Sequence, residues 1–206
     1  MKINLALSEL PDFTCLRGQS ESGPQRCGPE HRGTIHINAS TQDLEDAYYD
    51  AISGRPSRKP IIEMTIPTSV DHSIAPQGHH VASLFVQYAP YDLADGQWDD
   101  ATKNRFADLC IDEITRYAPN FRDAVVHRQI LSPVDLERIF GLTGGNIFQG
   151  SMPLHQLFSM RPVPGWSDYR TPIDGLYLCG SATHPGGGVM GACGRNAANE
   201  MLRDGR

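Results

Sequence analysis

A glycine-rich loop between two apolar segments near the C-terminus limits how this chain can fold more than any other feature. Residues 175–180, GLYLCG, predict a short buried strand, with Ser181 at its carboxyl end. Three consecutive glycines, Gly186–Gly188, then open a predicted helix that reaches from Val189 to Arg203. Because open α/β sheets bind ligands at the carboxyl ends of their strands, this arrangement predicts a ligand site in an α/β fold.

The glycines of this segment favour close approach by another group. Glycine lets a ligand come near the backbone, and a helix N-terminus presents unpaired N–H groups with a partial positive charge. Gly187, Gly191 and Gly194 are spaced four and three residues apart, so we expect them on one face of the predicted helix. Each one inside a helix costs roughly 0.5–1 kcal/mol relative to alanine. Two explanations fit: close packing against a flat cofactor, or tight packing against a strand without any ligand.

The remainder of the chain alternates between short strands and helices. Apolar residues at every second position predict strands, and spacings of three and four predict helices. The predicted strands cover 3–7, 34–38, 61–67, 79–88 and 123–131, and the predicted helices cover 41–51, 98–118 and a segment that begins at Pro133. We expect the strands before residue 132 to pair antiparallel in one sheet. Residues 12–33 and 141–150 predict loops, the first of them flexible at the surface.

Composition excludes several functions. The chain has 18 Lys and Arg against 24 Asp and Glu, scattered along 206 residues, so we expect no nucleic-acid partner. No apolar run reaches the roughly 18 residues of a membrane span. Five cysteines without a CxxC pair predict free thiols, with neither a disulfide framework nor a zinc site. His79 and His80 are neighbours in a predicted strand and point to opposite faces, so they predict no metal site.

Three segments carry a resemblance to a known family. LYLCGSATHPGGGVMGACGRNAA, LERIFGLTGGNIFQGSM and FSMRPVPG resemble the C-terminal flavin motif of the phytoene dehydrogenase and carotenoid isomerase superfamily of FAD-dependent oxidoreductases. The likeness extends over most of the chain and is greatest to a branch named for a pyridine nucleotide-disulfide oxidoreductase domain. It implies a partial substrate-binding domain at residues 1–150. Residues 151–206 are then the C-terminal strand–loop–helix of a Rossmann-like FAD-binding domain.

The resemblance also implies site residues. Gly180 and Ser181 are expected near the ribityl or pyrophosphate part of FAD, and Gly186–Met190 near the pyrimidine edge of the isoalloxazine, where the helix dipole favours negative charge. His184 either contacts the flavin, acts as an acid–base group or fixes the loop through a backbone hydrogen bond. The full cofactor set is Gly180, Ser181, His184, Pro185, Gly186, Gly187, Gly188, Val189 and Met190.

A second set is expected to face the substrate. Gly144, Gly145 and Asn146 either line the substrate side of the flavin or form a plain tight turn, and Arg161 lies near the flavin, near a substrate group, or in a purely structural place. No residue is assigned as catalytic. Cys179, inside the predicted strand, is expected to be a core thiol, so the sequence does not support disulfide chemistry.

One element of the family pattern is absent. No GxGxxG motif opens this chain, so we expect half of an FAD site and weak or no FAD binding by the chain alone. Either the chain is truncated, which we favour, or a partner chain supplies the N-terminal half.

The resemblance implies hydride transfer from a small apolar substrate to flavin. The alternatives are a cofactor-free interaction or regulatory protein of mitochondrial function and a bare substrate-binding module. The resemblance also implies a location: the mitochondrial matrix if the source is an animal, and the cytoplasm if it is a bacterium.

Overall fold

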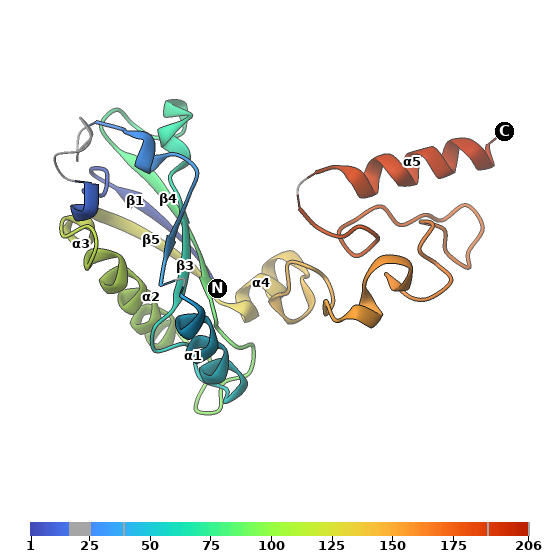
Figure 1. Cartoon of the computed structure of the whole chain (residues 1–206), viewed down its shortest axis with the longest axis horizontal. Coiled ribbons are helices and arrows are strands. Elements are labelled where there is room, and N and C mark those ends of the chain that lie inside the picture. Colours follow the sequence, from blue (N-terminus) through green and yellow to red (C-terminus); the bar gives the residue numbers. More distant parts are fainter. Residues whose placement is uncertain (17–25, 39, 189, 206) are drawn as a thin grey trace. The chain divides into compact units, whose positions relative to one another are not determined.

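The computed structural model describes residues 1–16, 26–38, 40–188 and 190–205 (Figure 1). The chain divides into two compact units, Met1–Asp135 (unit 1) and Leu136–Arg206 (unit 2). The sequence predicts a different boundary, at residue 150, between a substrate-binding part and an FAD-binding part. That boundary is one of function and stays a prediction. In chain order the strands and helices are β1 (Lys2–Leu7), β2 (Thr34–Ile37), α1 (Thr41–Ile52), β3 (Ile61–Thr65), β4 (His80–Gln87), α2 (Asp100–Thr115), α3 (Phe121–Ala124), β5 (Val125–Leu131), α4 (Pro133–Phe140) and α5 (Ala192–Asp204).

Unit 1 is built on one antiparallel sheet with the strand order β2-β3-β4-β1-β5. The N-terminal strand β1 lies between β4 and β5, with Ile3 opposite Leu84 on one side and Ile130 on the other. The mixed α/β fold and the antiparallel pairing are therefore confirmed. Strands far apart in the sequence meet because each alternates apolar and polar residues, which gives the sheet one face to bury.

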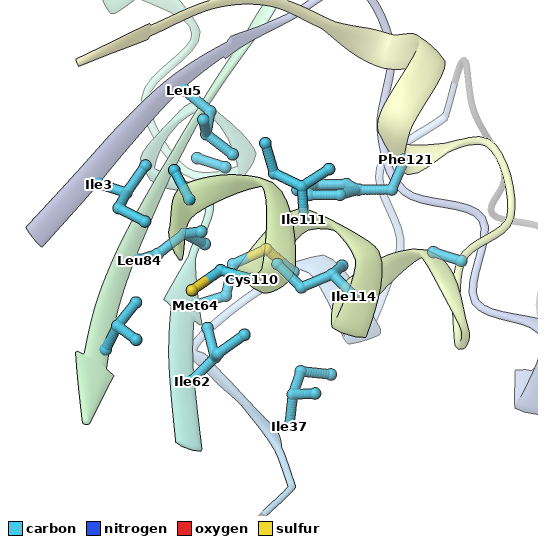
Figure 2. Close-up of a cluster of buried hydrophobic side chains, with 14 of the residues drawn as sticks. Ile3, Leu5, Ile37, Ile62, Met64, Leu84, Cys110, Ile111, Ile114 and Phe121 are labelled. Atoms are coloured by element: carbon cyan, nitrogen blue, oxygen red, sulfur yellow. The ribbon is translucent and has the colours of Figure 1, made fainter. Parts of the chain in front are cut away.

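The core lies between this face and helix α2 (Figure 2). The side chains of Ile3, Leu5 and Leu7 are fully buried, as their alternation predicts. Helix α2 contributes residues at spacings of three and four, and Phe121 of α3 closes one end. The buried residues drawn in Figure 2 include Ile3, Leu5, Ile37, Ile62, Met64, Leu84, Cys110, Ile111, Ile114 and Phe121.

Side-chain caps set where the two long helices of unit 1 begin. Helix α1 starts after Ser40, whose side chain accepts a hydrogen bond from the Asp43 amide at 3.2 Å. Helix α2 starts after Asp99, which accepts from the Thr102 amide at 2.7 Å. Those hydrogen bonds hold the pKa of the Asp99 carboxyl below its usual range. The Asp99 carboxylate is thus a helix cap.

The other face of the sheet carries half-buried polar side chains. Asn4 donates to Gln129 at 3.0 Å, Gln87 donates to Glu63 at 3.3 Å, and Lys2 bonds to Ser83. Helices α1 and α2 lie on the opposite, apolar face (Figure 1). Within unit 1, one side of the sheet therefore holds the fold together while the other presents hydrogen-bonding groups.

The predicted loop at 12–33 is only partly described, because residues 17–25 lie outside the described residues. Its far end differs from the prediction of a surface loop. His31 is buried, its Nδ1 accepts from the Gly28 amide at 3.0 Å, and its Nε2 lies 2.9 Å from the carbonyl oxygen of Pro11. A histidine ring that bridges two backbone segments is not detectable from composition, which is why this end of the loop was predicted to be exposed.

Unit 2 departs furthest from the predictions. Residues 175–180 form no strand; a single antiparallel bridge joins Arg170 to Tyr177, and Leu176, Leu178 and Cys179 are exposed. The predictions of a buried strand and of a core thiol at Cys179 are therefore wrong. An apolar run becomes a strand only when neighbouring strands pair with it, and no described strand lies beside this one.

The last helix also begins later than predicted. Helix α5 starts at Ala192, after Gly191, which has a left-handed φ of 66°. Gly186 and Gly188 have φ values of 102° and 145°, which a helix cannot contain. Gly187, Gly191 and Gly194 therefore do not share a helix face, and that prediction is wrong. Among the described residues, no helix is both long and apolar enough to span a membrane.

Candidate functional site

The glycines of residues 179–194 surround a cavity of about 160 Å³. Six of the predicted cofactor residues line it: Gly180, Ser181, Gly186, Gly187, Gly188 and Met190. A Cβ atom on Gly187 would lie 3.4 Å from the Cβ of Ser181, so any larger residue at 187 narrows the cavity. The fold thus brings together residues that the motif spreads over eleven positions, while Val189 lies outside the described residues.

The start of α5 forms one wall of this cavity. Ala192, Cys193 and Gly194 line it, and the Arg195 amide makes the first helical hydrogen bond, to Gly191, at 3.0 Å. The amides of residues 192–194 therefore precede the helical ladder and carry the partial positive charge of a helix N-terminus. The predicted juxtaposition of glycines and a helix start is present, although the helix begins four residues after the last of the three consecutive glycines.

Buried side chains fix the shape of the loop. Thr183 is buried and donates from Oγ1 to the Gly180 carbonyl at 2.7 Å. The Cys193 thiol donates to the Gly186 carbonyl at 3.3 Å. The Tyr169 hydroxyl donates to the carbonyl of His184 at 2.7 Å, and Asn196 of α5 donates to that hydroxyl at 2.7 Å. The loop is thus tied both to itself and to α5.

His184 and Pro185 lie away from the cavity lining. The His184 ring is half-buried, 6.3 Å from the ring of Phe158, and its backbone carbonyl is the acceptor for Tyr169. Pro185 is exposed. Of the three roles considered for His184, the geometry favours the structural one, in which this residue fixes the loop through its backbone.

Arg161 is the charged side chain that lies against this loop. It is 2% exposed, and its Nη2 donates to the carbonyl of Ser181 at 2.9 Å and to the carbonyl of Phe148. Its Nε is buried and has no hydrogen-bond partner among the described residues. A Cβ atom added to Gly186 would lie 3.9 Å from that Nε. An arginine of this kind is costly, because a buried cation normally has a carboxylate partner.

Of the remaining predicted substrate residues, one lies in the turn that Arg161 contacts and two lie in the turn before it. Asn146 donates from its side chain to the Gly150 carbonyl at 2.9 Å and accepts from the Phe148 amide at 2.9 Å, so it braces that turn. Gly144 and Gly145 form the preceding turn, where the Gly144 amide donates to Glu137 of α4 at 3.2 Å. Asn146 and Arg161 are therefore brought to one place, whereas Gly144 and Gly145 face α4.

The far end of α5 is held by an ionic cluster. Arg170 pairs with Asp204 at 2.7 Å and with Glu200 at 2.9 Å, and the Tyr177 hydroxyl donates to Asp204 at 2.6 Å. The hydrogen bond to Asp204 raises the pKa of the Tyr177 hydroxyl, and the bond from Arg170 lowers the pKa of Asp204. This cluster fastens residues 168–177 to the helix whose other end lines the cavity.

Sequence reasoning missed several residues at this site. Cys179, Ala192 and Cys193 line the cavity beside the predicted glycines, and their position inside the motif was the available signal. Tyr169 and Thr183 hold the loop from buried positions. Tyr169 comes from an irregular segment without periodicity, so no sequence pattern marks it.

The chain was compared with known proteins. No family model matches it. It is 54% identical, over 98% of its own length, to pyridine nucleotide-disulfide oxidoreductase domain-containing protein 2 of Rattus norvegicus. The chain belongs to the family of this oxidoreductase-domain protein. It spans 35% of that relative, or about a third of its length.

More distant relatives of this oxidoreductase family carry enzyme names. A limonene dehydrogenase polypeptide of Castellaniella defragrans is 32% identical over 68% of the chain, which covers 26% of that protein. The 4,4'-diapophytoene desaturase of Staphylococcus aureus is 28% identical over 82% of the chain, which covers 34% of it. These names support a relationship to flavin oxidoreductases and agree with the predicted resemblance.

Proposed function

We propose that the chain supplies the C-terminal part of the FAD site of an oxidoreductase that removes hydride from a C–H bond of a small apolar substrate. The observation that carries this proposal is Arg161, a buried guanidinium whose Nε has no partner among the described residues and lies next to Gly186, a residue that lines the cavity. An electron-rich edge of a bound ring would satisfy that donor. The oxidoreductase and desaturase names of the relatives add support.

The residues around the cavity fit part of FAD. Gly186, Gly187 and Gly188 permit close approach to the backbone, and the amides at the start of α5 favour negative charge there. The volume of about 160 Å³ lies below the roughly 300 Å³ of a complete ligand pocket. The cavity therefore suits one edge of the cofactor, and a second segment, in this polypeptide or a partner, would hold the remainder.

In this proposal the chain's own groups bind and orient. Gly180 and Ser181 would hold the ribityl or pyrophosphate portion, Gly186–Met190 the pyrimidine edge, and Arg161 would place positive charge beside that edge. Bound FAD would supply the hydride acceptor. Arg161 already fixes the Ser181 carbonyl to the turn at Phe148, so it would hold the two sides of the site in register.

Titration of FAD with the chain tests the proposal, followed by quenching of flavin fluorescence. We expect weak but saturable binding, reduced at least about tenfold by Gly187→Val, because the valine side chain occupies the cavity. Arg161→Met should weaken binding as well, by leaving the ring edge without its donor. Gly205→Val, at the end of α5 and outside the cavity lining, is the matched control and should bind like the unaltered chain.

Absence of FAD binding by a chain that circular dichroism shows to be folded would mean either that the half-site needs the N-terminal half to bind FAD, or that the alternative holds, a cofactor-free interaction or regulatory protein. One observation supports that alternative: unit 2 exposes large apolar side chains, with Leu154 at 84% and Phe158 at 68%. Such side chains are typical of surfaces that other proteins cover.

A further inference from the structure

Unit 1 contains a larger cavity, of about 380 Å³. Three segments enclose it: residues 54–58 after α1, the loop around Leu93 and Asp95, and the first half of α2 from Thr102 to Leu109. Its volume lies within the range of about 300–1,000 Å³ that is typical of small-molecule sites. It shares no lining residue with the glycine-lined cavity, and no predicted site residue lies in it.

The walls of this cavity are fixed by close contacts. The Ala94 amide donates to the Gly54 carbonyl at 2.8 Å. A Cβ atom on Gly54 would lie 2.8 Å from that same amide nitrogen, so only glycine allows the loop to approach. Ser57 is fully buried, and its hydroxyl lies 3.2 Å from the carbonyls of Ala47 and Tyr88. The cavity is therefore a defined part of the fold.

The lining of the cavity combines apolar side chains with guanidinium groups. Pro56, Leu93, Phe106 and Leu109 supply the apolar surface. Arg55 and Arg105 are exposed lining residues, and neither forms an ion pair within the described ranges. The lining thus offers an apolar interior and unpaired positive charge at the solvent side.

The other charges of the lining only partly offset those two arginines. Arg58 is paired with Asp50 at 3.1 Å, which lowers the pKa of the Asp50 carboxyl. Asp95 is the carboxylate among the lining residues. Within the lining, two guanidinium groups besides Arg58 face one carboxylate. Two carboxylates outside the lining also interact with them: the charge of Arg55 helps to lower the pKa of Asp50, and the charge of Arg105 helps to lower the pKa of Asp99. An anion is therefore favoured over a cation, and a long apolar tail over a compact polar ligand.

We propose that this cavity binds a monomeric aliphatic carboxylate, with its chain against Leu93, Phe106 and Leu109 and its carboxylate between Arg55 and Arg105. Arg105 is already oriented by a hydrogen bond from its Nη2 to Thr102 Oγ1 at 3.3 Å. Arginine pairs with carboxylates through two parallel N–H donors, which matches the group proposed. The proposal does not rest on the FAD site.

Calorimetric titration of the full chain tests this site, with decanoate and the neutral 1-decanol as probes below their aggregation limits. We expect decanoate to bind about tenfold or more tightly than decanol. The double variant Arg55→Met/Arg105→Met should lower decanoate affinity to the level of decanol and leave decanol unchanged. Arg32→Met, an exposed arginine of unit 1 outside the cavity, should change neither.

Leu109→Trp fills the cavity from α2 and should abolish binding of both probes, while urea unfolding checks that the variant is folded. Equal affinity for the two probes, the same loss in Arg32→Met, or undiminished binding in a folded Leu109→Trp would each overturn the site. Saturation with FAD should leave decanoate binding unchanged, so the outcome is independent of the flavin proposal.

Discussion

Replacing Phe121 with alanine is expected to lower the free energy of unfolding by about 3–5 kcal/mol. Phe121 is fully buried in the core cluster of unit 1 and is the first residue of α3, the short helix between α2 and β5. The lost side chain leaves a hole between the sheet and the end of α2 that surrounding residues fill only in part. Phe121 belongs to the same cluster of buried side chains as Ile111 and Ile114 (Figure 2), and this cluster would lose contacts.

The measurement is urea unfolding followed by circular dichroism, with Phe140→Ala as the matched control. Phe140 lies at the end of α4 and is 60% exposed, so its removal should cost far less. Losses of similar size in the two variants would mean that the core of unit 1 is not centred where the structure places it.

Replacing Asn38 with alanine should cost about 2–4 kcal/mol, for two separate reasons. Asn38 is buried with a left-handed φ of 59°, a conformation that asparagine tolerates and alanine resists. Its amide also donates to the buried carboxylate of Glu113 at 2.8 Å and to the Pro60 carbonyl at 3.1 Å. Alanine removes the hydrogen bond to Glu113, whose carboxylate keeps its ion pair with Arg116 at 3.0 Å.

Asn38→Gly separates the two reasons, because glycine adopts the left-handed conformation freely but still removes the side chain. We expect Asn38→Gly to be destabilised less than Asn38→Ala by about 1 kcal/mol, and exposed Asn199→Ala to be nearly neutral. If the glycine and alanine variants unfold at the same urea concentration, the backbone conformation at this position contributes nothing measurable.

The sheet of unit 1 was predictable because its strands carry their own pattern. Ile3, Leu5 and Leu7 occupy every second position, with Asn4 and Ala6 between them, and this period fixes which face each strand buries, wherever its partner lies in the sequence. Ser40 and Asp99 mark helix starts through local hydrogen bonds, so they too can be recognised without knowing the tertiary structure.

Unit 2 was less predictable because its order depends on contacts between distant residues. Residues 175–180 have the composition of a buried strand, but a strand forms only beside another. Gly186 and Gly188 have positive φ values, and sequence does not distinguish such a loop from the first turn of a glycine-containing helix. The burial of Arg161 follows from carbonyls at 148 and 181, far from it in the chain.

The sheet of unit 1 has an apolar face and a polar face. The residues that stabilise the fold therefore lie on one face, and residues that can mutate without disturbing the core lie on the other. Asn4, Gln129, Glu63 and Gln87 alternate with core residues along the same strands, yet they contact one another rather than the core. Mutations at these positions can alter the chemistry of a whole surface while the core stays intact. Such a scaffold lets related proteins diverge in what they recognise without first acquiring compensating changes in stability.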